Sequence, residues 1–299
     1  MGSGAQPSPR PSQNTEGLGC DAAINSDYYP NLYRGLTMRL FTEKRGNPKT
    51  AKNKVHSVIL HLSPANRSGF EVCKHRTPGC SASCLNLAGR GGIGAPEINS
   101  IQLARKARTT SFFKDRDNFY KDLYKDLELL EKQADKLGLD AAARLNGTSD
   151  IPWERVKPDI FTEFANIQFY DYTKYPDRLD IPSNYHLTFS LSETNKAQAL
   201  KVLDRGQNIA AVFDTKKGAP LPETCWGFPV FDADLDDERF ADPFGIAGLR
   251  AKGPAKKDYS GFVLNPNGTQ RIAAVCPQPI GDCSPYDLEQ AGRASIGVN

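Results

Sequence analysis

One strand-helix-strand unit most strongly limits how this chain can fold, namely YHLTFSLSETNKAQALKVLDRGQNIAAVFDTKKG, residues 185–218. Two apolar segments with polar ends flank a short segment of helical spacing that ends near Gly206. This order predicts a strand, a helix and a second strand. Similar apolar segments with polar ends occupy residues 139–150 and 167–174. Because alternating strands and helices form a parallel sheet with helices on its faces, we expect an α/β fold.

A first strand and two helices are expected in the N-terminal half. The strand is VHSVILHLSP, residues 55–64, which is apolar and β-branched and ends in a turn-prone segment. Residues 98–115 and 118–138 are each predicted to form a helix, and Gly138 is a typical stop signal for the second. The apolar face of this second helix comprises Phe119, Leu123, Leu127, Leu130, Ala134 and Leu137. We expect both helices to pack on the sheet.

The chain divides by composition into a tail and one domain. Gly, Pro and Ser are abundant and apolar residues scarce at the start, which predicts a disordered tail over residues 1–25. Residues 26–299 are expected to form a single α/β domain. From about residue 225 onward the sequence is rich in strand and turn signals. This part either closes a barrel or forms a β-rich annex.

The overall composition describes a soluble globular protein. The chain has 299 residues, of which 39% are apolar and 24% charged, so it can bury a proper core. With 38 basic and 35 acidic residues spread along it, the charge does not support nucleic-acid binding. No apolar run approaches the roughly 20 residues that span a membrane, and no signal peptide is evident. We therefore expect a cytoplasmic protein with no membrane partner.

Three cysteines lie close together in CKHRTPGCSASC, residues 73–84. They are Cys73, Cys80 and Cys84, with six and then three residues between them, in a chain that has seven cysteines. An odd number of cysteines in a cytoplasmic chain argues against a disulfide framework and favours metal ligation. Small residues and a Pro-Gly pair let this loop fold around a bound object.

The kind of metal centre stays open at this stage. Three thiolates on one loop suit a [4Fe-4S] cluster, or a zinc site if His75 joins them. Cys276 or Cys283 is a candidate fourth ligand, which would close a cluster. The alternative is three unrelated thiols, some of them buried as small apolar side chains.

The position of the cysteine loop resembles the layout of radical S-adenosylmethionine (SAM) enzymes, in which three cysteines follow the first strand. That resemblance implies a partial TIM-like βα barrel, a [4Fe-4S] cluster with an open iron, and SAM bound there. It also implies that a turn after the second strand meets the amino group of SAM. The matching turn in RLNGTSDIPWE consists of Asn146, Gly147, Thr148, Ser149 and Asp150. The superfamily usually has C-x3-C-x2-C spacing, whereas here the longer gap comes first.

Polar residues at other expected strand ends are further candidates for a ligand site. In parallel sheets, ligands gather at the carboxyl ends of the strands. We expect Ser190 to contact a cofactor at this edge. The alternative is that residues at such positions cap the next helix. The same two interpretations apply to Asp171, Lys174, Ser192 and Glu193.

Several other motifs have a structural interpretation as well as a functional one. GRGGIG, residues 89–94, follows a loop rather than a strand, so it is not expected to bind a dinucleotide. Arg105 and Arg108 could pair with a carboxylate or phosphate, or lie on a solvated helix face. The acidic segment 232–242 is more typical of ion pairs than of a cation site. Lys252 is expected in a turn, and hydrogen-bonded core positions are expected for His56, His61 and His186.

A set of longer motifs resembles one family over residues 55 to about 280. These motifs are CLNLAGRGG, ARKARTTSFF, RLNGTSDIPWE, FYDYTK, TFSLSETN, FDADLDDERFADPFGIAGLRAKG and GFVL. Together they are similar to the bacteriophage gene product 88 family and its relatives on phages and plasmids. The resemblance implies a mobile-element origin, and hence the host cytosol for a phage-encoded chain, but no particular reaction.

The sequence supports three hypotheses about function. The first is a radical-SAM-like enzyme that acts on a small-molecule or nucleotide substrate. The second is a non-catalytic zinc or iron-sulfur protein in which the metal orders the long loop. The third is a phage module that binds nucleic acid or a host factor, which the balanced charge disfavours.

Overall fold

The computed structural model describes Met1 and residues 38–43, 55–178 and 180–273. The chain divides into two units, Met1–Thr37 and Met38–Asn299, and the described helices and strands belong to the second. Except for Met1, the predicted tail over residues 1–25 lies outside the described residues, as do Cys276 and Cys283.

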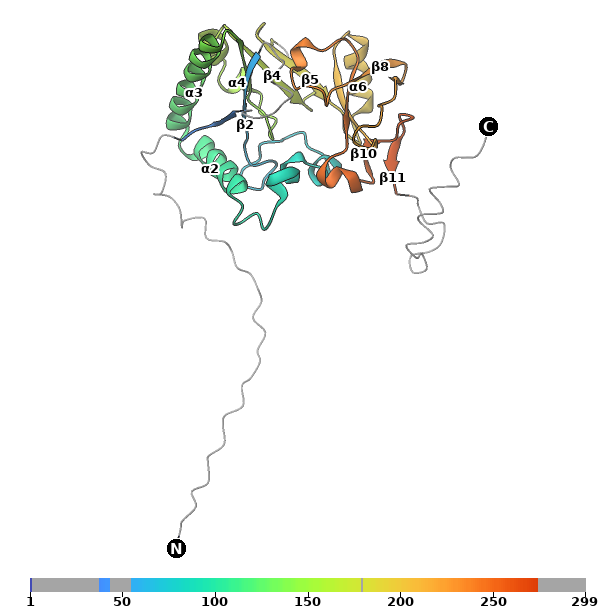
Figure 1. The fold of residues 1–299 in the computed structure, drawn as a ribbon, viewed down its shortest axis with the longest axis horizontal. Helices are drawn as coiled ribbons and strands as arrows, with labels where there is room; N and C mark the ends of the chain where they lie inside the picture. Colours follow the sequence, from blue (N-terminus) through green and yellow to red (C-terminus); the bar gives the residue numbers. More distant parts are fainter. Residues whose placement is uncertain (2–37, 44–54, 179, 274–299) are drawn as a thin grey trace, which may run out of the picture. The chain divides into compact units, whose positions relative to one another are not determined.

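Parallel strands in sequence order form the centre of a single sheet (Figure 1). Each of these strands pairs in parallel with the next one along the chain. They are β2 (Val55–Leu60), β3 (Asp140–Arg144), β4 (Ile167–Thr173), β5 (Tyr185–Ser190) and β6 (Ile209–Phe213). Because the order never reverses, right-handed connections carry the intervening helices to one face of the sheet.

The C-terminal third extends this sheet. Beyond β6 lie β9 (Ile246–Arg250) and then β8 (Phe228–Asp232), both parallel to their neighbours. Antiparallel strands, β1 (Phe41–Glu43) beside β2 and β7 (Thr224–Cys225) beside β8, form its two ends. In the described part of the chain the sheet is therefore mixed and open, which confirms an α/β fold but not a closed barrel.

The sheet branches at β6. Strand β5 pairs with β6 only where Phe189 and Ser190 meet Ile209 and Ala210. Farther along β6, the parallel partner is β10 (Ser260–Leu264), which forms a hairpin with β11 (Gln270–Ile272). The polar end of β5 thus leaves the sheet as β10 enters it, at the edge where parallel strands usually bind ligands.

The two long helices form where the sequence predicts them. They are α2 (Ser100–Lys114) and α3 (Arg116–Leu137), and α3 packs against β2 and β3 (Figure 1). Helix α3 ends at Gly138, whose left-handed backbone (φ 64°) suits a residue without a side chain. Its expected apolar face is buried except for Leu137, which is 58% exposed. The shorter α6 (Lys196–Asp204) packs against β5 and β6.

Short helices lie in the connections. They are α1 (Pro78–Ala82), α4 (Trp153–Val156), α5 (Asp159–Glu163) and the 3₁₀ helices η2 (Leu85–Leu87), η3 (Gly89–Gly92), η4 (Arg239–Ala241) and η5 (Gly253–Lys257). The largest core joins the helix-covered face of β2 to β5 to α2, α3, α4 and α5, with Trp153 and Phe119 fully buried. Within the described residues, no helix combines the length and the apolar character that crossing a membrane requires.

Candidate functional site

The face of the sheet opposite α3 is polar, which is unusual for parallel strands. Strand register puts Ser57 opposite Ala142, Tyr170 opposite His186, and Tyr172 opposite Thr188 on this face. Its contacts agree with the register, because the Ser57 and Tyr170 hydroxyls are 2.8 Å apart. We call this surface the polar face. Its polar residues on the strands are Ser57, Arg144, Tyr170, Tyr172, His186, Thr188 and Ser190, and His61 and Lys174 continue the alternation just beyond the ends of β2 and β4.

The cysteine loop covers the C-terminal edge of the strands that carry this face. Buried Val72 anchors its start, because the Val72 carbonyl accepts a hydrogen bond of 2.8 Å from the Asp150 backbone N–H. Thr77 begins α1 by accepting the backbone N–H of Cys80, and Pro78 is preorganised for the first turn. The loop is therefore tied to the turn that follows β3.

The three thiols are half-buried and lie near one another. Burial, more than any other cause, raises the pKa of Cys73 to about 12, and the neighbouring Cys80 and Cys84 act in the same direction. Burial also raises the pKa of Cys84. Cys73 Sγ accepts the backbone N–H of Ala65 at 3.5 Å and donates to the Thr148 carbonyl at 3.8 Å. The loop thus brings all three predicted ligands to one region.

Helix α2 fixes the segment after Cys84. Asn86 is fully buried, and Arg105 Nη1 donates to its side-chain and backbone oxygens at 2.5 and 3.1 Å. Gln102 bonds to the same asparagine and to the carbonyl of Gly91. Arg105 therefore points inward from α2 and does not lie on a solvated helix face, which was one of its two expected positions. It lies near enough to Cys84 for their charges to interact.

The turn after β3 approaches the polar face so closely that it needs a glycine. A Cβ on Gly147 would lie 2.5 Å from Nδ1 of His61 and 2.6 Å from Ile59. Burial and the charges of nearby arginines, Arg105 and Arg144 among them, lower the pKa of His61 to about 3. The imidazole is therefore neutral at ordinary pH, and no described residue hydrogen bonds to its Nδ1.

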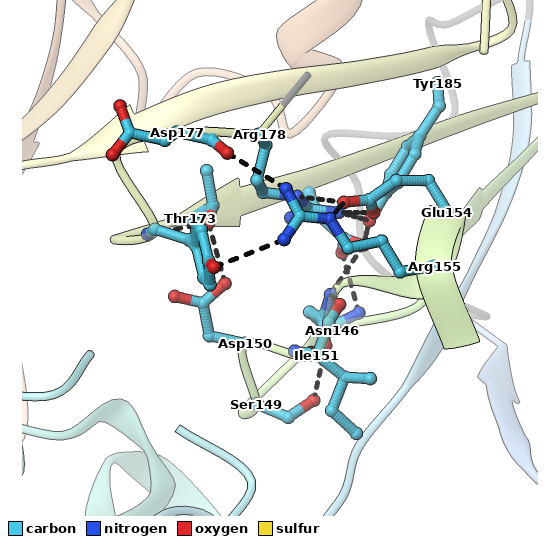
Figure 2. Close-up of polar contacts among 12 residues, drawn as sticks. Asn146, Ser149, Asp150, Ile151, Glu154, Arg155, Thr173, Asp177, Arg178 and Tyr185 are labelled. Carbon is cyan, nitrogen blue, oxygen red and sulfur yellow. Dashed lines mark hydrogen bonds and ion pairs between the residues drawn. The ribbon is translucent and has the colours of Figure 1, made fainter. Parts of the chain in front are cut away.

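Asn146 and Ser149, two of the residues expected to contact SAM, are hydrogen-bonded within the protein (Figure 2). Asn146 is 2% exposed, and its backbone and side-chain nitrogens both donate to Asp171, at 2.7 and 3.0 Å. Its side-chain oxygen accepts the Ser149 hydroxyl and the Ile151 N–H. The carboxylate of Asp150 accepts the Thr173 hydroxyl at 2.8 Å. These bonds hold the turn in shape beside Cys73.

Ser190, the last residue of β5, lies at the same edge of the sheet and contacts Lys174. Lys174 Nζ donates to the Ser190 hydroxyl at 2.7 Å and lies 5.6 Å from the Phe262 ring centre. Ser192 is buried, with a hydroxyl that has no partner among the described residues. Glu193 binds α1 through the backbone N–H of Gly79. Thus the NGTSD turn, Ser190 and the cysteine loop all lie at one edge of the sheet.

The remaining candidates have structural partners. Arg108 donates to the Arg39 carbonyl, and Lys252 pairs with Asp234 at 2.5 Å. Asp171 is fully buried on the helix-covered face, so it does not line a pocket. His56 and His186 contact Gln133 and Thr188. GRGGIG forms η3 and the turn after it.

The acidic segment makes ion pairs, as its structural interpretation predicts. Asp232 and Asp234 pair with Arg250, while Asp236 and Asp242 flank Arg239, whose side chain is 1% exposed. The adjoining Phe240 ring packs on Tyr170 with a centroid distance of 5.4 Å. The segment therefore covers part of the polar face.

Arg144 is the residue that the sequence interpretation missed. Its guanidinium lies 4.6 Å from the centre of the Tyr172 ring, and its Nε is buried with no partner among the described residues. The period-two run of Gln168, Tyr170, Tyr172 and Lys174 was the available signal, since it marks a polar strand face. Within the described part of the chain, no group of three or more His, Cys, Asp or Glu side chains is arranged to hold a metal ion.

Comparison with known proteins places the chain in one family. The model of the family described as Gene product 88 matches residues 40–266, which cover both the cysteine loop and the polar face. The chain belongs to the gene product 88 family. No curated protein and no solved structure was found to be similar to it.

Proposed function

We propose that Cys73, Cys80 and Cys84 hold a [4Fe-4S] cluster and that the chain is a radical-SAM-like enzyme. The observation that carries this proposal is the meeting of three neighbouring thiols with a polar sheet face at the carboxyl ends of parallel strands. The unbroken order of β2 to β6 is that of a partial βα barrel, which supports the same layout.

The surroundings of the thiols suit a metal-sulfur centre. Backbone N–H groups of Ala65 and Asn86 point at Cys73 and Cys84, and such bonds tune the potential of bound clusters. The charges of Arg67 and Lys174 favour the thiolate of Cys84. As a thiol, Cys73 donates to the Thr148 carbonyl, and metal binding would replace that proton. The thiols would have to rotate toward a common point.

The chain's own residues would then position SAM and substrate. A cluster with an open iron, carrying SAM, would supply one-electron chemistry. Gly147 lets the turn pack closely against His61 and Ile59, and Thr148 Oγ1 holds the turn by donating to the Leu62 carbonyl at 2.5 Å. Asn146, Ser149 and Asp150 would keep the turn rigid, and Ser190 would offer its hydroxyl opposite. The substrate, a small molecule or nucleotide, would lie on the polar face.

A structural zinc site is the second candidate. His75 Nε2 is buried without a hydrogen-bond partner in the described part of the chain, and its ring packs against Tyr175. Zinc coordinated by His75 and the three cysteines would satisfy this nitrogen. Such a closed site would order the loop without catalysis.

Anaerobic purification with iron, zinc and sulfide analysis tests both candidates. Electron paramagnetic resonance of the dithionite-reduced protein, with and without SAM, is the second step. We expect iron and sulfide, a signal that changes when SAM is added, and loss of the cluster in Cys73→Ala. The matched control is Cys225→Ala, because Cys225 is buried in a separate core cluster. Zinc in place of iron, or a cluster indifferent to SAM, rules out the enzyme proposal.

A further inference from the structure

The charge of the chain is balanced in total but unevenly distributed. Residues 61–114, which include the cysteine loop and α2, contain eight Lys and Arg residues and only two Asp and Glu residues. Residues 232–242 contain six Asp and Glu residues and a single Arg. Because a charged surface acts on its partners through local clusters of charge, the place of these cations in the fold matters more than the net charge.

Packing brings this basic segment together with a second one, η5. Gln102 of α2 donates to the Gly91 carbonyl in η3 at 2.6 Å, which holds α2 against the segment after the cysteine loop. That segment contacts η5 through η2, and Cys80 packs against the core cluster that contains Ala255 of η5. Figure 1 shows α2, the cysteine loop and η5 along the same side of the molecule. They therefore form one continuous surface.

Exposed cations lie on every part of this surface. In the cysteine loop region, Arg67 lies near enough to Cys84 for its charge to favour the thiolate. At the end of α2, the Lys114 ammonium lies 5.7 Å from the centre of the Phe70 ring. We call this region the basic surface, and its exposed cations are Arg67, Lys74, Arg90, Lys106, Lys114, Lys256 and Lys257. Within the described residues, none of these cations forms an ion pair with a carboxylate.

The carboxylates of the same region do not neutralise these cations. Glu71 pairs with Arg76 at 3.0 Å, and Asp258 is buried and accepts the Ser260 hydroxyl at 2.7 Å. Glu97 is exposed, but it is a single negative charge among several positive ones. The basic surface therefore keeps an excess of positive charge, which attracts a polyanion.

We propose that the basic surface binds the phosphate backbone of a nucleic acid. Exposed Lys and Arg side chains spread over three segments suit a row of phosphates better than one small anion. Tyr259 is 54% exposed two residues after Lys257, and the guanidinium of Arg271 lies 4.3 Å from the centre of its ring. Aromatic and guanidinium groups of this kind stack on bases. The proposal goes beyond the proposed function, because such binding requires neither a metal nor SAM.

Fluorescence anisotropy of the full-length protein tests the proposal. The probes are a labelled single-stranded DNA of about 20 nucleotides, longer than common site sizes, and the matching duplex. We expect saturable binding that weakens as KCl rises, because phosphate contacts release counterions. Lys106→Gln should lower the slope of log K against log[KCl] by about 1, and Lys256→Gln/Lys257→Gln by about 2. Because no cluster is needed, failure of the cluster proposal leaves this result interpretable.

The matched control is Lys136→Gln/Lys201→Gln. It removes two exposed charges near the ends of α3 and α6, which lead into β3 and β6 at the opposite edge of the sheet. This variant should bind as the wild type does, and circular dichroism checks that each variant is folded. Absence of saturable binding to either DNA overturns the proposal, as does an equal loss of affinity in the control.

Phosphatidylserine vesicles, tested in parallel, distinguish a nucleic acid from an anionic membrane surface. Binding to the vesicles but not to DNA overturns the proposal, since a membrane also attracts exposed cations. Tighter binding of the single strand supports stacking of bases on Tyr259, and Tyr259→Ala should then weaken it. Tighter binding of the duplex supports contacts to phosphates alone.

Discussion

Glu193 Oε1 accepts the backbone N–H of Gly79 at 2.7 Å, which joins the loop after β5 to the helix that carries Cys80. The other carboxylate oxygen accepts the Thr77 hydroxyl, also at 2.7 Å. A Cβ on Gly79 would lie 2.7 Å from Glu193 and 2.2 Å from the Ser260 hydroxyl, so only glycine fits this position. A single carboxylate therefore positions the middle of the cysteine loop.

Glu193→Ala should lower the free energy of unfolding by about 2 kcal/mol, since two charge-assisted hydrogen bonds are lost and their donors are left unpaired. Glu193→Gln keeps one acceptor and should cost less. Urea unfolding at neutral pH measures both. Glu128→Ala, which removes an exposed carboxylate on α3, should change stability little. Equal effects of the alanine variants at Glu193 and Glu128 would show that the bridge contributes nothing.

Local sequence signals were sufficient for the elements but not for their long-range pairing. The boundaries of α3 followed from a 3.6-residue apolar period and Gly138, both of which lie within the helix and its cap. The strand β10 pairs with β6 at Val212 and Phe213, about 50 residues away in sequence, and nothing in either segment encodes that partner. The branched sheet was therefore not predictable.

The sequence predicted which polar residues lie together, but not which of them bond to one another. The polar residues after the strands lie along one edge of the sheet because parallel strands end together. Asn146 and Asp171, both candidates for a ligand site, bond to each other, since only the tertiary structure brings β4 beside the turn after β3. Arg144 was overlooked because its own neighbours, Ala143 and Leu145, are apolar, and the signal for a polar strand face lies on β4 instead.

Gly147→Ala should destabilise the protein by about 1–3 kcal/mol, because a methyl group there overlaps His61 and Ile59. Thermal unfolding followed by circular dichroism measures the change. The double variant His61→Ala/Gly147→Ala should recover part of the loss in stability, since much of the steric overlap is with the edge of the His61 imidazole. Simple additivity of the two single variants would contradict this close approach.

Glu154→Gln should cost about 3–5 kcal/mol, because it leaves the buried guanidinium of Arg178 without its counter-charge. Both side chains are nearly inaccessible, at 3% and 2% exposed, and Figure 2 shows them beside Tyr185. This ion pair ties α4 to the segment before β5. Chemical denaturation measures the loss, and Glu97→Gln, which changes an exposed residue, is the control. A cost below about 1 kcal/mol, as for a surface pair, would refute the assignment.

The buried carboxyl of Asp171 should make stability depend on pH in an unusual direction. Burial raises its pKa from 3.8 to about 6, against the opposing effect of hydrogen bonds such as that from the Tyr185 hydroxyl at 2.7 Å. The folded state therefore binds this proton more tightly than the unfolded state. Its stabilising contribution is complete below about pH 4 and is lost as the pH rises through about 6.

Comparison with Asp171→Asn isolates this effect, because the other titrating groups are common to both proteins. The unfolding free energy of the wild type minus that of the variant should fall by about 2 kcal/mol between about pH 4 and pH 7. Urea unfolding across this range measures the difference. A difference that instead grew with pH would mean that the donors from Asn146 and Tyr185 hold the carboxylate ionised in the folded state. The turn after β3 would then be anchored by an ionised Asp171 carboxylate rather than by a protonated carboxyl group.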